Sequence, residues 1–78
     1  MVFIMEQQNL SKASVGRAVV EKIAGDKIVR DKLKKYGIEE NTVLTVLGKI
    51  SFGGVIVAVD GKKFVLTKQL AENIVVIK

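Results

Sequence analysis

The chain contains no cysteine, no histidine and no proline among its 78 residues. Without cysteine it lacks disulfides, zinc–thiolate sites and thiol nucleophiles. Without histidine it lacks the commonest general base and the commonest protein ligand of transition metals. No serine is followed three residues later by lysine, which is the spacing of a serine nucleophile with a lysine base. We therefore expect no enzymatic activity, no metal site and no cofactor.

Aromatic side chains are also scarce, at 5% of the residues. A hydrophobic core must then be built mainly from valine, isoleucine and leucine, and the β-branched members of this set favour strands. Hydrophobic residues make up 49% of the chain and charged residues 27%, which is typical of a folded globular protein. With 78 residues there is room for one domain with one core.

No hydrophobic run is long enough to span a bilayer, which takes about 20 apolar residues in a helix. The longest apolar stretch at the N-terminus covers residues 1–5, without the basic segment and longer apolar segment of a signal peptide. We expect residues 1–9 to form an N-terminal arm, with residues 1–5 as a strand or part of that arm; a membrane-inserting tip is the less favoured alternative. The expected location is cytoplasmic, without direct insertion into a membrane.

Short runs of valine, isoleucine and leucine, separated by turn residues, predict five β-strands. Asp60 and Gly61 stand between two of these runs, and an Asp-Gly pair in that position predicts a two-residue type I′ hairpin turn. Thr67 can cap a single helical turn before the last strand. The predicted strands cover residues 17–24, 42–47, 55–59, 62–66 and 73–77.

One basic helix interrupts this pattern of strands and turns. Val29, Leu33 and Tyr36 are spaced at i, i+4 and i+7, which places them on one apolar face. Asp26 can cap the N-terminus of the helix, and Gly37 can adopt the left-handed conformation that ends it. The sequence therefore predicts a mainly β protein, a small SH3-like barrel of about five strands over residues 10–78. One α-helix follows the first strand, and a short helical turn precedes the last.

The net charge of +5 is concentrated on the predicted helix, because five of the 13 basic residues lie between positions 27 and 35. A basic face of this kind suits nucleic acid, anionic lipid headgroups or an acidic protein surface. Sequence-tolerant nucleic-acid binding relies on aromatic side chains that stack on bases, and the chain has few of them. The composition therefore gives little support to nucleic-acid binding, and the basic face can also be simply a solvated surface.

Two aromatic residues have alternative interpretations. Tyr36 ends the apolar face of the helix, so its ring can cover the barrel or take part in recognition. Phe52 lies in a loop, where it either packs against the helix or is presented to a partner. The adjacent Gly53 and Gly54 lead into a strand rather than a helix, so they predict a tight bend and not a phosphate-binding loop. The candidate partner-binding residues are Lys27, Arg30, Lys34, Lys35, Tyr36 and Phe52.

The order of these segments resembles the FeoA family, the small cytosolic proteins of bacterial ferrous-iron uptake. Arg30, Leu33, Gly37 and Ile38 match the family's Arg-x-x-Leu-x-x-x-Gly-[Ile/Phe] helix. The other matching segments, in order, are residues 15–20, 53–57, 60–61, 64–66 and the Ala-x-x-Ile-x-Val pattern of residues 71–76. The family often has proline where this chain has Val55, and glycine where it has Asn41; both departures lie in turns or at their edges.

The resemblance implies an SH3-like barrel that acts as a non-enzymatic adaptor or regulator of FeoB, a membrane Fe(II) transporter with a cytosolic G-protein domain. The partner would be this cytosolic region, and the protein would reach the inner face of the membrane through it. Two alternatives remain open. One is the related C-terminal SH3-like domain of DtxR-type iron-dependent repressors, although we find no residues for the helix-turn-helix that precedes it. The other is a basic nucleic-acid-binding barrel.

Overall fold

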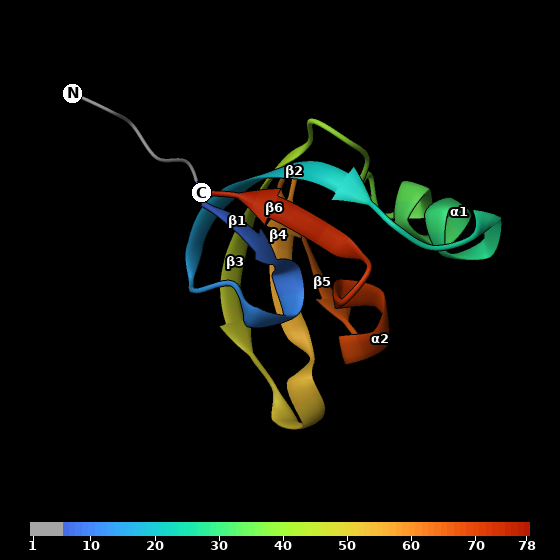
Figure 1. Ribbon diagram of the computed structural model, residues 1–78. Helices are drawn as coiled ribbons and strands as arrows, with labels where there is room; N and C mark the ends of the chain where they lie inside the picture. Colours follow the sequence, from blue (N-terminus) through green and yellow to red (C-terminus); the bar gives the residue numbers. More distant parts are fainter. Residues whose placement is uncertain (1–5) are drawn as a thin grey trace.

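The computed structural model describes residues 6–78, which form one curved antiparallel sheet with two helices and two 3₁₀ turns (Figure 1). The strand order in the sheet is β1-β6-β2-β3-β4-β5. The strands are β1 (Gln7–Asn9), β2 (Gly16–Ile23), β3 (Val43–Lys49), β4 (Val55–Val59), β5 (Lys62–Leu66) and β6 (Ile74–Ile77). The helices are α1 (Lys27–Lys35) and α2 (Lys68–Ala71), and the 3₁₀ turns are η1 (Leu10–Lys12) and η2 (Ser51–Gly53).

The mainly β, SH3-like architecture with one helix after a long strand confirms the sequence-based fold prediction. Strands β4 and β5 occupy the predicted residues, and α1 and α2 lie where they were expected. The structure adds β1, within the segment interpreted as an N-terminal arm. This strand pairs with β6, with Gln7 opposite Ile77. The strand or extended segment expected over residues 1–5 lies outside the described residues.

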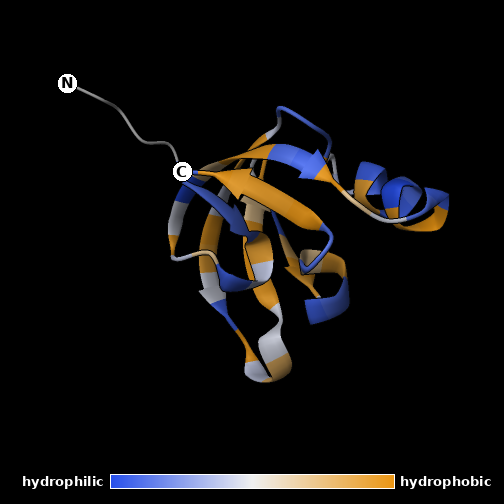
Figure 2. Ribbon diagram, in the orientation of Figure 1, coloured by the Kyte–Doolittle hydropathy of each residue, from blue (hydrophilic) through white to orange (hydrophobic). Residues whose placement is uncertain are grey.

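The hydrophobic core lies on the concave side of the sheet, because alternate side chains of each strand point to that side. Figure 2 shows the apolar residues recurring along the strands. Residue Val20 of β2 and Val76 of β6 face each other across the ladder, and both are fully buried. Irregularities in the ladder at Glu21 in β2 and Leu47 in β3 mark β-bulges, which increase the local bend of the sheet.

The two edge strands of the sheet are β1 and β5. The 3₁₀ turn that follows β1, η1, lies in contact with the helix that follows β5, α2. Helix α2 contacts both β5 and η1. The side-chain oxygen of Asn9 accepts a hydrogen bond from the backbone N–H of Ser11, and its amide nitrogen donates to the carbonyl of Glu72 at 2.7 Å. Thr67 caps α2 by accepting a hydrogen bond from the N–H of Leu70, as predicted. These contacts help to close the barrel where strand pairing stops.

Both ends of α1 have the caps that the sequence predicted. The Asp26 side chain accepts a hydrogen bond from the N–H of Val29 at 3.1 Å. At the other end, Gly37 has a φ of 79°, and the N–H of Ile38 donates to the carbonyl of Leu33 at 3.0 Å. This pattern is a Schellman motif, completed by burial of both Leu33 and Ile38. The capped helix projects from one side of the barrel (Figure 1).

The turns explain where the strands end. Asp60 and Gly61 have φ angles of 50° and 80°, which fits the predicted type I′ turn between β4 and β5. Asn41, at a φ of 72°, occupies the left-handed conformation expected for it before β3. Within residues 6–78, neither helix has the length and apolar character needed to cross a bilayer.

Candidate protein-interaction site

Helix α1 presents two different surfaces beside its buried face. Residues Lys27, Arg30 and Lys34 lie on one of them, and line a groove of about 570 Å³. The loop that follows the helix supplies two carboxylates, Glu39 and Glu40, to the same groove. Its lining is completed by Asp31 and by two buried apolar residues, Ile23 and Ile38. The groove therefore combines an apolar base with charges of both signs, which differs from the uniformly basic face expected from the sequence.

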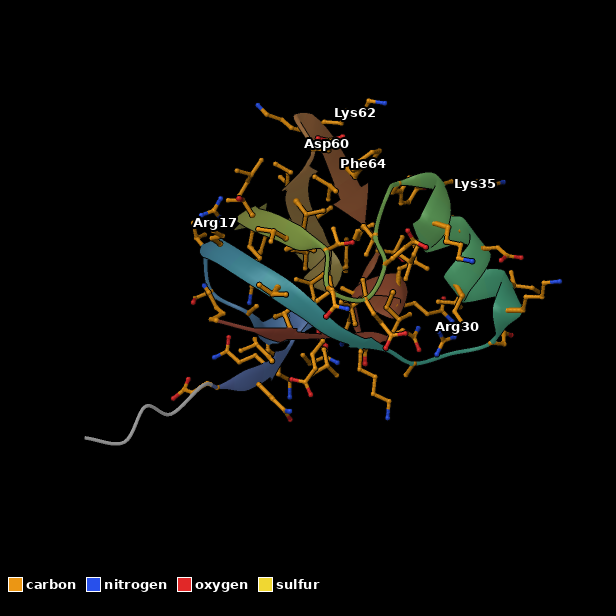
Figure 3. The ribbon with its side chains drawn as sticks, turned by 90° about the horizontal axis from the view of Figure 1, so that it is seen from above. Arg17, Arg30, Lys35, Asp60, Lys62 and Phe64 are labelled. Atoms are coloured by element: carbon orange, nitrogen blue, oxygen red, sulfur yellow. The ribbon has the colours of Figure 1, made fainter. Side chains whose placement is uncertain are left out.

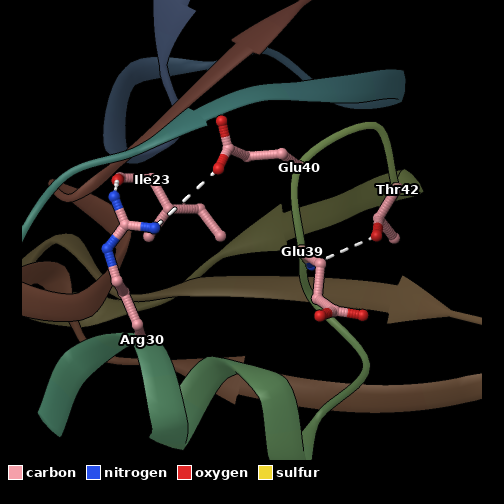
Figure 4. Close-up of polar contacts among 5 residues, drawn as sticks. All are labelled: Ile23, Arg30, Glu39, Glu40 and Thr42. Atoms are coloured by element: carbon pink, nitrogen blue, oxygen red, sulfur yellow. Dashed lines mark hydrogen bonds and ion pairs between the residues drawn. The ribbon is translucent and has the colours of Figure 1, made fainter. Parts of the chain in front are cut away.

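Arg30 is held in this groove by bonds within the protein (Figure 4). Its Nη2 donates a 2.6 Å hydrogen bond to the carbonyl oxygen of Ile23, and its Nη1 lies 3.8 Å from Oε1 of Glu40. The neighbouring loop is fixed by a 3.1 Å hydrogen bond from the N–H of Glu39 to the hydroxyl of Thr42. Arg30 thus connects α1 to the end of β2, and its charge is partly balanced by Glu40.

Lys27 and Lys34 are different, because both are exposed and the Arg30–Glu40 pair is the only ion pair within residues 6–78. Both side chains line the groove, and no carboxylate of the described residues 6–78 lies within ion-pair distance of either ammonium group. These two lysines are accordingly the cations of the groove that remain available to an acidic partner.

The second surface of α1 faces away from the groove and contains Lys35. Lys32, Lys35 and Tyr36 line a shallow hollow there, together with Ile28 and Asp31. The Tyr36 ring stacks on Phe64 of β5, with the ring centroids 4.7 Å apart and the planes at 29°. Tyr36 is half-buried and packs against the core, so its predicted role in covering the barrel is confirmed. Figure 3 shows Lys35 and Arg30 at different positions along the helix, with Phe64 on β5.

Phe52 lies away from α1, contrary to the interpretation in which it packs against the helix. Its side chain is 96% exposed. It precedes β4, whereas Gly37 at the end of α1 lies against Val59 at the other end of the same strand. The ring beside Tyr36 is that of Phe64, which pairs with Val57 in the middle of β4. The candidate residues Tyr36 and Phe52 therefore do not line a common groove among residues 6–78.

The turn that carries Phe52 is tightly built. The N–H of Ile50 donates to the carbonyl of Gly54 at 2.9 Å and closes the turn. Gly53 has a φ of 80°, and a Cβ atom there would lie 2.7 Å from Cδ of Lys68. The predicted tight bend at Gly53 and Gly54 is confirmed.

The candidate residues named from the sequence did not include Glu39 and Glu40 of the groove, or Phe64, which stacks on Tyr36. Phe64 falls in a predicted strand, but its packing against Tyr36 depends on how α1 docks on the barrel. Glu39 and Glu40 lie outside the predicted helix and strands. Glu39 and Glu40 follow shortly after Gly37, which ends the helix, and this short separation in the sequence is the only signal that predicts a position near α1. Within residues 6–78, no three acidic residues are grouped closely enough to hold a metal ion.

Comparisons with known proteins identify the family and the fold. The model of the FeoA domain matches residues 8–78. Comparison with curated proteins finds no match to the chain. Among solved structures, an iron uptake regulatory protein (FeoA) is 29% identical with a TM-score of 0.84, and the match covers 91% of this chain and 96% of that one. A FeoA-like protein from Clostridium acetobutylicum is 24% identical with a TM-score of 0.78, covering 94% and 87%.

Metal-dependent repressors share the fold. A manganese-dependent transcriptional repressor is 24% identical with a TM-score of 0.85, and the match covers 99% of this chain but 44% of the repressor. At this identity the likeness shows the fold alone. The family match spans nearly all of the described residues, and the likeness to the FeoA crystal structure extends over almost the full length of both proteins. The chain therefore belongs to the FeoA family.

Proposed function

We propose that this protein is a non-enzymatic adaptor or regulator of a FeoB-type ferrous-iron transporter, and that it acts by contact with the cytosolic region of the transporter. The observation that carries the proposal is the FeoA domain match over residues 8–78. An iron uptake regulatory protein is also among the similar structures, at 29% identity. The protein would work at the cytoplasmic face of the membrane, where this region of the transporter lies.

The groove beside α1 supports a contact with an acidic segment of the transporter. Lys27 and Lys34 offer two cations that make no ion pair within residues 6–78, next to the buried side chains of Ile23 and Ile38. An extended peptide could place carboxylates against the lysines and an apolar side chain between them. Glu39 and Glu40 would disfavour a uniformly acidic peptide, and they would fix its direction through repulsion at one side.

A binding measurement with the purified cytosolic region of the FeoB-type transporter from the same genome tests this function. We expect wild-type protein to bind, and the Lys27→Glu/Lys34→Glu variant to bind at least tenfold more weakly. Each lost attraction becomes a repulsion against the acidic segment. Arg30 is left intact because its hydrogen bond to Ile23 gives it a structural role.

A matched control carries the same change of charge elsewhere. Lys12→Glu/Lys63→Glu alters two exposed lysines of η1 and β5 that do not line the groove. If both double variants lose affinity equally, the contact depends on net charge and not on the groove. Absence of binding by the wild-type protein, with a transporter domain that still binds guanine nucleotide, would contradict the adaptor function.

A further inference from the structure

The turn between β3 and β4 holds Phe52 in a backbone conformation that phenylalanine rarely adopts. Its φ is 65° and its ψ is 25°, in the left-handed region. The described chain has two other non-glycine residues with positive φ, Asn41 and Asp60, and both belong to the types that tolerate this conformation. A bulky aromatic residue there is unusual.

No packing among residues 6–78 compensates for this strain. The Phe52 side chain is 96% exposed and therefore contributes almost no packing to the domain. Glycine or asparagine would suit the backbone better and would lose no buried contact. Strained residues that persist without a structural benefit are concentrated at functional positions.

The turn is also preorganised. The hydrogen bond between Ile50 and Gly54 closes it, and the Lys68 side chain packs over Gly53. A Cβ atom at Gly54 would lie 2.5 Å from Cγ1 of Ile50, so that side chain fills the space above Gly54. The backbone that carries the Phe52 ring is thus fixed before any partner arrives, which lowers the entropy lost on binding.

The surroundings of the ring are basic and partly apolar. Lys49 precedes the turn and Lys68 of α2 packs over Gly53, and residues 42–59 contain neither aspartate nor glutamate. Ile50 and Leu47 are exposed on the same hairpin. The surface with an aromatic anchor, apolar neighbours and two flanking lysines is complementary to an apolar pocket rimmed by carboxylates.

We propose that Phe52 is a preformed anchor that inserts into such a pocket on the cytosolic region of the transporter. This proposal rests on the function proposed above and adds a second contact to it, because the turn between β3 and β4, at the bottom of the view in Figure 1, lies away from α1. A shaped pocket is favoured over a lipid surface. A bilayer accepts an aromatic ring from a flexible loop equally well, and would not require a fixed, strained backbone.

The test compares wild type, Phe52→Asn and Val43→Thr, each as the full chain, for binding to the full-length FeoB-type transporter in nanodiscs. Empty nanodiscs of the same anionic lipid form the second arm. Val43→Thr is the control, because Val43 is an exposed apolar residue at the opposite end of β3. We expect Phe52→Asn to lose about 30-fold in affinity, as for an anchor residue of an interface. Val43→Thr should bind as the wild type does.

Thermal unfolding of the same three proteins provides an independent readout. Phe52→Asn should raise the Tm by about 4 °C, because it relieves the backbone strain without removing a packed side chain. Stabilisation combined with loss of binding is the expected signature of a residue retained for recognition. A lower Tm for Phe52→Asn would overturn the strain argument on which the proposal depends.

The outcomes separate the two proposals. If wild type binds and Phe52→Asn binds equally well, the anchor proposal is wrong and the adaptor function stands. If wild type does not bind the transporter at all, both are wrong. If the Phe52→Asn substitution weakens binding to empty nanodiscs as much as it weakens binding to nanodiscs that contain the transporter, then the ring contacts lipid. That result would overturn the proposed pocket on the transporter.

Discussion

The guanidinium of Arg30 donates a 2.6 Å hydrogen bond to the carbonyl oxygen of Ile23, seven residues earlier in the chain. This carbonyl belongs to the last residue of β2, immediately before the chain turns into α1. Through its contact with Glu40, the same side chain also reaches the loop that follows the helix. Arg30 therefore holds three consecutive segments together, and a change at this position alters stability as well as surface charge.

Replacing Arg30 by alanine should lower the free energy of unfolding by about 1.5 kcal/mol, the lower end of the range for a hydrogen bond that involves a charged group, because the Arg30 side chain is half-exposed. Lys34→Ala, on the same side of α1, should change it by less than about 0.5 kcal/mol, as expected for an exposed surface residue. Urea unfolding followed by circular dichroism measures both. Equal effects of the two variants would show that the Arg30 contact to β2 adds no stability.

The Asp26 cap should contribute measurably to α1. Asp26→Ala removes the acceptor for the N–H of Val29 and should destabilise the protein by about 1 kcal/mol. Asp26→Asn keeps a side-chain oxygen at the same place and should come close to wild type. Urea unfolding of the two variants distinguishes capping from a general effect of charge, since both substitutions remove the carboxylate.

The stacked rings of Tyr36 and Phe64 should be energetically coupled. A double-mutant cycle with Tyr36→Leu and Phe64→Leu should give a coupling free energy of about 0.5–1.5 kcal/mol. Leucine keeps apolar bulk at each position, so the cycle isolates the interaction between the rings. Strictly additive effects would mean that the two rings are neighbours without stabilising each other.

Gly54 should not tolerate a side chain. In Gly54→Ala, the new Cβ atom would lie 2.5 Å from Cγ1 of Ile50 and 3.2 Å from the carbonyl oxygen of Leu66. The rearrangement should cost about 1–3 kcal/mol. Gly48→Ala is the matched control, because no atom lies within 4 Å of its added Cβ. Adding Ile50→Ala to Gly54→Ala should restore part of the lost stability if the clash with Ile50 is the cause.

Lys78 should order the loop before β2. Its ammonium group donates to the carbonyl of Ser14 at 2.7 Å, to the hydroxyl of Ser14 at 2.9 Å and to the carbonyl of Val15 at 3.1 Å. Lys78→Met should therefore accelerate amide hydrogen exchange around Val15 and Gly16, while exchange in β4 remains slow. Unchanged exchange near Val15 would argue against an ordering role for this lysine.

Several features of the fold could be predicted because each depends on a short stretch of sequence. The Asp60-Gly61 turn follows from the positive φ that type I′ turns require, and the caps at Asp26 and Gly37 follow from hydrogen bonds within one helical turn. Strand β1 was not predicted, and the reason is physical. Its sequence, Gln-Gln-Asn, has no apolar alternation, and it is a strand only because its backbone pairs with the edge of β6.

The candidate site was predicted less completely. The cations of α1 were identified correctly as belonging to one helix, but their division into two surfaces depends on which face docks on the barrel. Glu39 and Glu40 became groove residues only when the loop after α1 folded back beside Arg30. The sequence left open whether Phe52 packs against the helix, whereas the register of β4 and β5 places Phe64 beside Tyr36.

The sequence by itself determined that this protein is a small, mainly β domain with one capped basic helix and no histidine or cysteine chemistry. Periodicity, caps and turns are local, and composition needs no structure at all. Only the tertiary structure decided that Arg30 bonds to the end of β2, that Lys27 and Lys34 form no ion pair among residues 6–78, and that Phe52 is exposed on a turn away from α1. These properties arise from contacts between residues distant in the chain, which strand register and helix docking bring together.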